Sequence, residues 1–118
     1  MLFGSKEFKI MEQSADALWR KQKVISQNIA NYDTPNYKAK TLTFSEVLQG
    51  QQNSNDGKMI DVTVTTDETA TVRPDGNNVD MIKENLELYK TYMQSAYLYE
   101  KINGKFSSIR NVLNQMPK

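Results

Sequence analysis

A narrow apolar stripe in the first thirty residues most constrains what this chain can fold into. Its members are Met11, Ala15, Leu18, Gln22, Ile25 and Ile29, which are alternately four and three residues apart. This spacing is the heptad pattern of helices that pack along one seam, with Gln22 as its single polar member. No Pro or Gly interrupts residues 6–30, so we expect one helix of roughly 37 Å. A helix with so narrow a seam cannot bury itself and needs a partner helix.

The other end of the chain has the same pattern over residues 79–113. The seam positions there are Val79, Ile82, Leu86, Tyr89, Met93, Ala96, Tyr99, Ile102, Phe106, Ile109 and Leu113. Two consecutive steps of three, between Ala96 and Ile102, overwind a coiled coil locally. Gly104 follows, but the stripe resumes beyond it, so we expect the helix to continue. Asn78 is the expected N-cap, with Asp80 in the first turn.

These two helices define the expected fold class, which is mainly α. We expect them to pack as an antiparallel coiled coil, forming a helical domain from residues 1–40 and 78–118. Only 38% of the 118 residues are hydrophobic, which is lean for a self-sufficient core in one folded unit. A core that neighbouring subunits complete would account for this composition.

The region between the helices, residues 41–77, is expected to be a short insert. Thr43 and Glu46 fit a capping box, which predicts a short helix over residues 44–49 that ends at Gly50. Residues 50–58 are polar and rich in Gly and Asn, as in a flexible loop. Apolar and polar residues alternate over 60–65, which predicts a strand. With a returning strand at Ala70 to Val72, residues 59–73 would form a β-hairpin.

The residue types present argue against catalysis. The chain has no His and no Cys, which excludes imidazole bases, thiolate nucleophiles and the metal sites built from them. Neighbouring carboxylates such as Asp67 and Glu68 fit solvated charges better than a buried acid–base pair. We therefore expect no catalytic residue, no cofactor and no metal, and favour a helical structural or interaction protein over an enzyme.

Charge and hydropathy limit the partners. The net charge of +1 offers no field that would attract a nucleic acid. Tyrosines at 89, 92, 97 and 99 have two interpretations, a platform for stacking bases or the border of a helix interface, and we favour the interface. No apolar run is long enough to span a membrane, and residues 1–13 lack the pattern of a cleavable signal peptide. We expect neither membrane insertion nor a cleaved signal.

The first helix ends on the string "NIANYDTPNYKAK", residues 28–40. Thr34-Pro35-Asn36-Tyr37 has the signature of a type II turn, since Pro35 presets φ and Asn36 tolerates a positive φ. Asn28 and Asn31 lie one turn apart, and their amides can pin this corner by hydrogen bonds. A plain helix stop explains Pro35, but it does not require both asparagines, Tyr37 and the Lys-Ala pair that follows.

This string resembles the N-terminal signature of the flagellar basal-body rod and hook proteins, commonly A-N-x-x-T-P-G-Y. Asn36 replaces the usual Gly, and Asn is the next most tolerant residue at a left-handed position. A second string, "DGNNVDMIKENLELYKTYMQSAYLYEKINGKFSSIRNVL", resembles the C-terminal segment of the proximal rod members of this family. The two matches cover roughly half of the chain, and the short insert also favours a proximal rod protein.

The resemblance implies a structural subunit of the rod, the drive shaft of the flagellar motor in the basal body. It implies that the terminal helices polymerise, with this chain itself and other rod proteins as partners. Further implied partners are the membrane-ring and export-gate base and the flagellar type III export apparatus, which would carry the chain across the inner membrane. Alternatives that remain are another small rod protein of the family and a helical export chaperone or adaptor.

Overall fold

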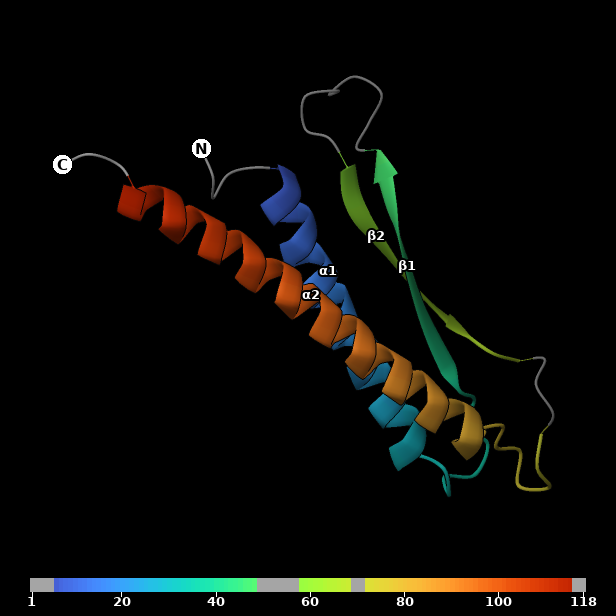
Figure 1. Ribbon diagram of the computed structural model, residues 1–118. Helices are drawn as coiled ribbons and strands as arrows, with labels where there is room; N and C mark the ends of the chain where they lie inside the picture. The colour runs from blue at the N-terminus through green and yellow to red at the C-terminus, as the bar shows by residue number, and fades with distance from the viewer. Residues whose placement is uncertain (1–5, 49–57, 69–71, 116–118) are drawn as a thin grey trace.

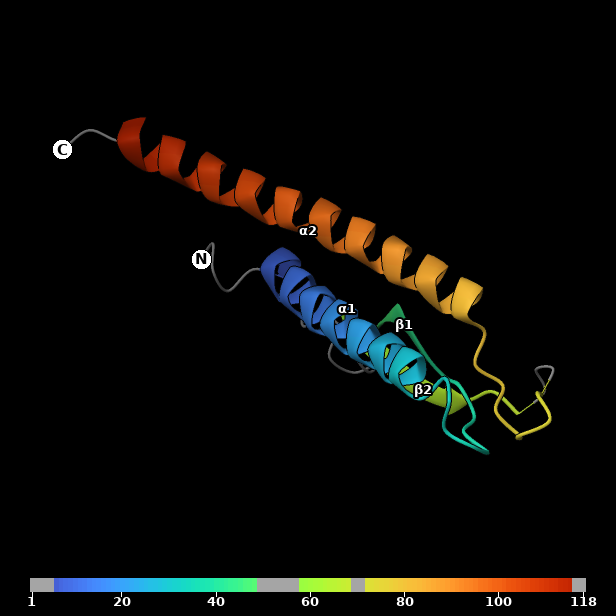
Figure 2. The same cartoon turned by 90° about the horizontal axis from the view of Figure 1, so that it is seen from below.

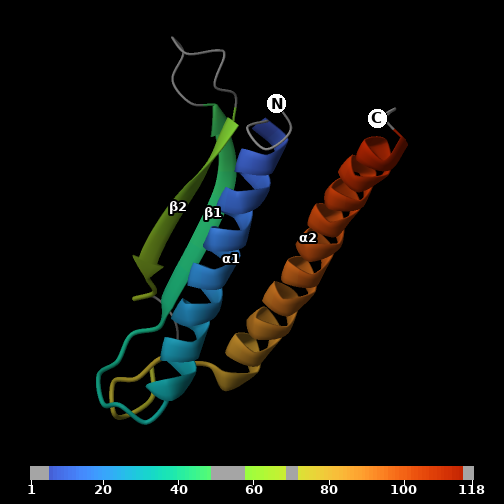
Figure 3. The same cartoon turned by 90° about the vertical axis from the view of Figure 1, so that its left-hand side faces the viewer.

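The computed structural model describes residues 6–48, 58–68 and 72–115, which form two long helices and a two-stranded sheet (Figure 1). The elements are α1 (Lys6–Ala30), β1 (Lys40–Leu48), β2 (Lys58–Thr66) and α2 (Met81–Gln115). They lie side by side, with α1 between the sheet and α2 (Figure 3). The molecule measures 70 × 34 × 15 Å, and its radius of gyration is 19.2 Å. A compact chain of this length would have a radius of about 13.5 Å, so this fold is an elongated slab.

The two helices run antiparallel, as expected, and α1 has the expected bounds (Figure 2). The rings of Phe8 and Phe106 lie 5.6 Å apart near the start of α1, and the Lys21 ammonium lies 3.7 Å from the Glu87 carboxylate farther along. Helix α2 begins and ends two residues later than expected and continues through Gly104 without a break. At about 52 Å it extends well beyond α1.

The N-cap of α2 is Asp80, so the expected cap at Asn78 is wrong. The Asp80 carboxylate accepts hydrogen bonds from the backbone N–H groups of Ile82, at 3.1 Å, and Lys83, at 3.3 Å. A carboxylate at this position satisfies free N–H groups and interacts favourably with the helix dipole. Asn78 is buried instead, because it is engaged in contacts with the sheet.

The insert differs from the prediction in two respects. The short helix expected over 44–49 is wrong, because residues 44–48 belong to β1. The expected hairpin partner of β2 is also wrong: β2 pairs antiparallel with β1, in a register that places Leu42 opposite Val64. Most of the predicted loop, 50–57, and residues 69–71 of the predicted return strand lie outside the described residues. The local capping signal lost to alternation, because Leu42 and Phe44 supply the apolar face that β2 needs beside it.

The strand predicted over 60–65 is present, and its alternation orients the sheet. Leu42, Phe44, Ile60 and Val62 are buried or half-buried on the face toward α1. The opposite face is exposed and rich in threonine. The Gln13 side chain of α1 accepts a hydrogen bond from the Ile60 N–H at 2.8 Å, which joins β2 to the helix. The sheet therefore depends on α1 for its only described apolar cover.

The face of α2 toward α1 is not the seam expected from the sequence. The covered positions recur at three and four residues and include Met81, Glu84, Leu88, Thr91, Ser95, Leu98, Ile102, Lys105 and Ile109. In the first half of α2, the expected seam residues are exposed: Ile82 by 82%, Leu86 by 52%, Tyr89 by 63% and Met93 by 57%. Only after the two three-residue steps does the apolar stripe come round to α1, at Ile102 and Ile109.

Replacement of Leu42 by Ala tests the packing of the sheet on α1. Leu42 is 3% exposed, whereas Val64, opposite it in the register, is 51% exposed. We expect Leu42→Ala to lower the free energy of unfolding by about 2–4 kcal/mol, since it leaves a cavity. Val64→Ala should cost under about 1 kcal/mol. Urea denaturation followed by circular dichroism measures both, and equal losses would contradict this register.

Candidate functional site at the asparagine corner

Residues 28–40 and 73–80 meet at one end of the slab, where α1 ends and where β1 and α2 begin (Figure 1). We call these two segments the corner. Three asparagine side chains are buried in it, with exposed fractions of 0% for Asn28, 0% for Asn77 and 5% for Asn78. Buried amides are costly unless every donor and acceptor has a partner. Their hydrogen bonds therefore define how the corner is built.

Asn28 joins the end of α1 to the first residue of β1. Its Nδ2 donates to the Lys40 carbonyl at 2.7 Å, and its Oδ1 accepts from the Lys40 N–H at 3.0 Å. The amide thus pairs with the edge of β1 as a neighbouring strand would. The Tyr37 hydroxyl also donates to Asn28 Oδ1, at 3.1 Å.

The turn at residues 34–37 has the geometry that its sequence favours. The Tyr37 N–H donates to the Thr34 carbonyl at 3.3 Å, and Asn36 has a φ of 63°. A positive φ at the third residue is what a type II turn requires. Asn31 closes the helix before the turn, because its Nδ2 donates to the Gln27 carbonyl at 2.7 Å and its Oδ1 accepts from the Thr34 hydroxyl at 3.0 Å.

Asn77 joins that turn to the segment before α2. Its Nδ2 donates to the carbonyls of Asn31, at 2.8 Å, and Thr34, at 2.7 Å. Its Oδ1 accepts from the Val79 N–H at 2.8 Å. One side chain therefore satisfies backbone groups that are more than forty positions apart in the sequence, which fixes where the chain returns after the sheet.

Asn78 joins both strands to the start of α2. Its Oδ1 accepts from the Ala39 N–H at 2.6 Å, and its Nδ2 donates to the Asp67 carbonyl. Its own N–H donates to the Tyr37 carbonyl at 3.2 Å. The beginning of β1, the end of β2 and the approach to α2 are thereby held by one residue.

Gly76 fits against the turn because it has no side chain. Its φ is +86°, and a Cβ at this position would overlap Oδ1 of Asn36. The Asn36 N–H donates to the Asp75 carbonyl at 2.9 Å, and the Lys38 ammonium donates to the Gly76 carbonyl. Glycine meets both the backbone conformation and the close approach.

The outer rim of the corner is closed by Arg73. Its guanidinium lies 3.9 Å from the centre of the Tyr32 ring and also donates to the Tyr32 carbonyl. The same group lies 3.8 Å from the Asp75 carboxylate. This contact between the end of α1 and the approach to α2 is a cation–π pair with a flanking charge.

The corner contains one buried carboxyl group. Glu84 is 5% exposed, and burial raises the pKa of its side chain, which a hydrogen bond from Asn28 offsets only in part. Burial also raises the pKa of Tyr37, and the neighbouring charge of Glu84 acts in the same direction. The folded state thus favours the protonated form of Glu84.

The corner has the properties of a structural joint. Among the described residues, every buried side-chain nitrogen or oxygen has a hydrogen-bond partner, and no cluster of three or more acidic residues could hold a metal ion. What this arrangement does is fix the directions of α1, the sheet and α2 relative to one another.

The residues singled out from the sequence fall into two groups in space. Asn28, Asn31 and the turn residues 34–37 all lie in the corner. On α1, Leu18 and Ile25 are buried, while Met11, Ala15 and Ile29 are half-buried. On α2, Ile102 and Ile109 are half-buried, whereas Phe106 and Leu113 are exposed by 39% and 62%. Val79 is buried in the corner rather than in a helix.

Sequence reasoning missed four residues of the corner: Arg73, Gly76, Asn77 and Glu84. Gly76 was available as a signal, because a glycine after Pro-Asp commonly supplies a positive φ. Nothing local marks Asn77 or Glu84, because their partners lie on a distant part of the chain.

Two glycine substitutions should have opposite effects on stability. Gly76→Ala should lower the free energy of unfolding by more than about 2 kcal/mol, because it combines an unfavourable φ with an overlap at Asn36. Gly104→Ala should raise it by about 0.5–1 kcal/mol, because a Cβ there meets no atom within 4 Å and alanine favours the helix. Urea denaturation of the isolated chain measures both, and a harmless Gly76→Ala would contradict the described corner.

The Glu84 carboxyl group should make stability depend on pH. Above pH 4.5, the ordinary pKa of a glutamate, the unfolded chain releases this proton before the folded chain does. The free energy of unfolding should therefore fall as the pH rises, until the raised pKa of the folded state has been passed. Glu84→Gln should remove this part of the fall, whereas Glu100→Gln, at an exposed position of α2, should keep the wild-type profile. Denaturation curves between about pH 4 and 8 provide the measurement, and identical profiles for Glu84→Gln and wild type would refute the assignment.

Neither helix, within the described ranges, is both long and apolar enough to span a membrane. The family model described as flagella basal body rod protein matches residues 15–38, which include the end of α1 and the turn. The chain is 39% identical over 105 residues to the flagellar basal body rod protein FlgB of Bacillus subtilis (strain 168), covering 79% of this chain and 81% of that protein. It is 27% identical to FlgB of Aeromonas hydrophila, with 92% of each chain covered, and 26% identical to FlgB of Escherichia coli (strain K12), covering 89% of this chain and 91% of that protein. This chain therefore belongs to the family of flagellar basal-body rod proteins and is a structural rod subunit, not an enzyme.

Proposed function

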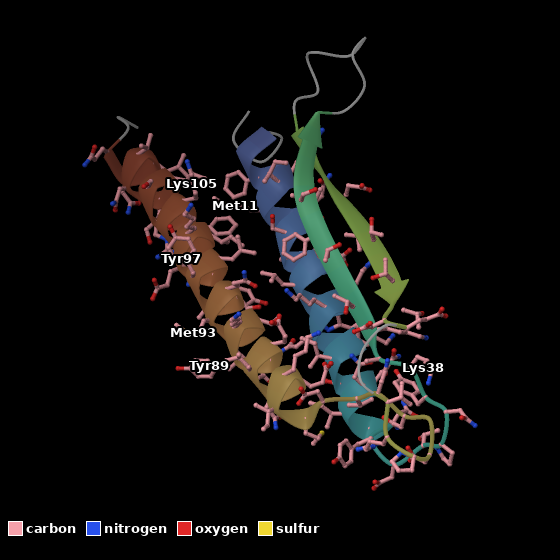
Figure 4. The ribbon with its side chains drawn as sticks, turned by 90° about the vertical axis from the view of Figure 1, so that its right-hand side faces the viewer. Met11, Lys38, Tyr89, Met93, Tyr97 and Lys105 are labelled. Atoms are coloured by element: carbon pink, nitrogen blue, oxygen red, sulfur yellow. The ribbon has the colours of Figure 1, made fainter. Side chains whose placement is uncertain are left out.

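We propose that this subunit forms part of the proximal rod, where it polymerises through α1 and α2 and transmits torque. The observation that carries this proposal is the row of large apolar side chains on the side of α2 away from α1. Figure 4 shows Tyr89, Met93 and Tyr97 pointing outward there, whereas Met11 lies between the helices. A face of this kind indicates a protein–protein contact that the single chain does not contain.

The surface of the whole molecule supports the same conclusion. Its accessible area is 8795 Å², whereas a compact protein of 13.6 kDa exposes about 6,600 Å². The excess arises because the elements form a single slab, in which each helix has few neighbours. Trp19 on α1 is 60% exposed, and Met11, Ala15 and Ile29 are only half-buried. Packing between subunits would cover these side chains.

Torque transmission requires elements that keep their relative directions under load. The corner meets this need, because buried and saturated amides join α1, the sheet and α2 in place of a flexible linker. In the proposed rod, the corner residues Asn28 to Tyr37 hold the direction of α1, and the seams of α1 and α2 pair within and between subunits.

The partners follow from the family. We propose that this chain contacts copies of itself, other rod proteins and the base formed by the membrane ring and the export gate. We also propose that the type III export apparatus carries it across the inner membrane without a cleaved signal. The identity to proteins named FlgB favours a proximal position over that of another small rod protein. A helical export chaperone is disfavoured, because family membership already accounts for both end segments.

A genetic complementation experiment tests the assembly function. Cells that lack this gene should be non-motile and should lack complete rods, and the wild-type gene should restore both. Met93→Asp should fail to restore motility, because it places a charge on the outward apolar face of α2. Gln94→Asp, at the next and exposed position, is the matched control and should restore motility.

Swimming assays and electron microscopy of basal bodies provide the measurements, and circular dichroism checks that both variants are folded. Complete rods in the deletion strain would refute the proposed function. Full motility of a folded Met93→Asp variant would refute the role of this face.

A further inference from the structure

The outward face of α2 changes in character along its length. Its first half has large side chains at Ile82, Leu86, Tyr89, Met93 and Tyr97, each exposed by more than half. We call this part the bulky half. Farther along the same face come Gly104, Ser107 and Asn111, all exposed, which we call the slim half. Positions that are whole turns apart share a face of a helix, so the two halves form one continuous stripe.

Gly104 in the slim half has no explanation within the single chain. A glycine inside a helix is less favourable than alanine, because it loses more backbone freedom on folding. A Cβ at Gly104 would meet no atom within 4 Å, so nothing in this chain requires the missing side chain. Its φ is not in the left-handed region either. What a glycine on an exposed helix face does permit is the close approach of another chain.

The two halves match each other in size at one particular offset. Gly104 lies eighteen residues after Leu86, which is five turns at 3.6 residues per turn. The same offset relates Tyr89 to Ser107 and Met93 to Asn111. Each large side chain of the bulky half thus has a small or slender counterpart in the slim half, about 27 Å along the axis.

We propose that α2 of one copy packs with its bulky half on the slim half of α2 in the next copy. The two helices run parallel and are staggered by five turns, so that Leu86 of one copy lies over Gly104 of the other. This inference rests on the proposed function, and it names the surface and the register of one contact within the rod.

The area of the bulky half suits such a contact. Aromatic side chains bury about 150–250 Å² each, so the exposed parts of these five residues with the adjacent Tyr92 amount to roughly 700 Å². A standard interface buries about 800 Å² on each partner, and isolated apolar patches on monomers are smaller than that. A second copy can supply a surface of the right size, because every copy also carries a slim half.

The parallel arrangement follows from what the contact must achieve. An antiparallel pair would match the same sizes, but both copies would use the whole stripe, and the contact would close at two copies. In the staggered parallel arrangement, each copy uses its bulky half on one neighbour and its slim half on another. Such a contact continues from subunit to subunit, as a rod requires.

Cysteine cross-linking tests the register, and the natural absence of Cys makes the experiment clean. The Leu86→Cys/Gly104→Cys double variant is expressed as the only copy in flagellated cells, and basal bodies are oxidised and run on non-reducing gels. We expect a ladder of dimers, trimers and longer species, because the two positions lie within disulfide reach in neighbouring copies. Each single variant should stay monomeric, and the two singles expressed together should give dimers only.

Three results would overturn the proposal. A closed dimer as the sole product of the double variant would show antiparallel pairing. Cross-linking of either single variant by itself would show an unstaggered contact. Complete rods and motility with no cross-link would exclude this register while leaving the proposed function intact.

A size exchange keeps the test decisive if the cysteine variant does not assemble. Gly104→Leu should fold like the wild type, since its site is open, yet it should abolish motility by filling the slim half. Leu86→Ala combined with Gly104→Leu should restore at least half of the wild-type swimming rate. Gln94→Leu adds a similar apolar side chain elsewhere on exposed α2 and should leave motility unchanged. Failure of the pair to restore motility would contradict the contact between Leu86 and Gly104.

Discussion

The saturated hydrogen bonding of three buried asparagines is the constraint on which the rest of this structure depends. A primary amide has two donors and a carbonyl oxygen, so it can satisfy several backbone groups at a place where regular secondary structure ends. Asn28 does this for β1, Asn77 for the turn and Asn78 for both strands. Removal of any one of these amides would leave backbone groups buried and unpaired, which costs more than the hydrogen bond itself contributes.

The remainder of the fold is incomplete by the same standard. The interface of α1 with α2 includes Glu84, Thr91 and Ser95, so the helices meet through a partly polar face. The larger apolar side chains of α2 point the other way. The chain has thus placed its polar network inside the corner and much of its apolar surface outside, which is the reverse of a self-sufficient domain. Assembly into the rod accounts for both choices.

Both helices and the turn were predictable from the sequence, because heptad spacing and Pro35-Asn36 act over short distances. The strand β1 was not predictable in this way, since the local signals of Thr43 and Glu46 favour a helix and only β2 and α1 override them. Half of the corner was found through Asn28 and Asn31, whereas Asn77 and Gly76 escaped because their contacts cross long stretches of chain. The stripe on α2 was visible in the sequence, but spacing alone cannot say whether it meets α1 or a different chain.

The position of the corner at one end of a long helix has a mechanical consequence. Helix α2 is a lever of about 52 Å that is anchored near Asp80. An angular error of about one degree at the anchor displaces the far end by about 0.9 Å, which already exceeds the tolerance of a close-packed contact. The precision of the far contacts is therefore set at the near end, by amides that never touch a neighbouring subunit in the proposed register. A substitution in the corner would appear in the rod as misalignment several nanometres away.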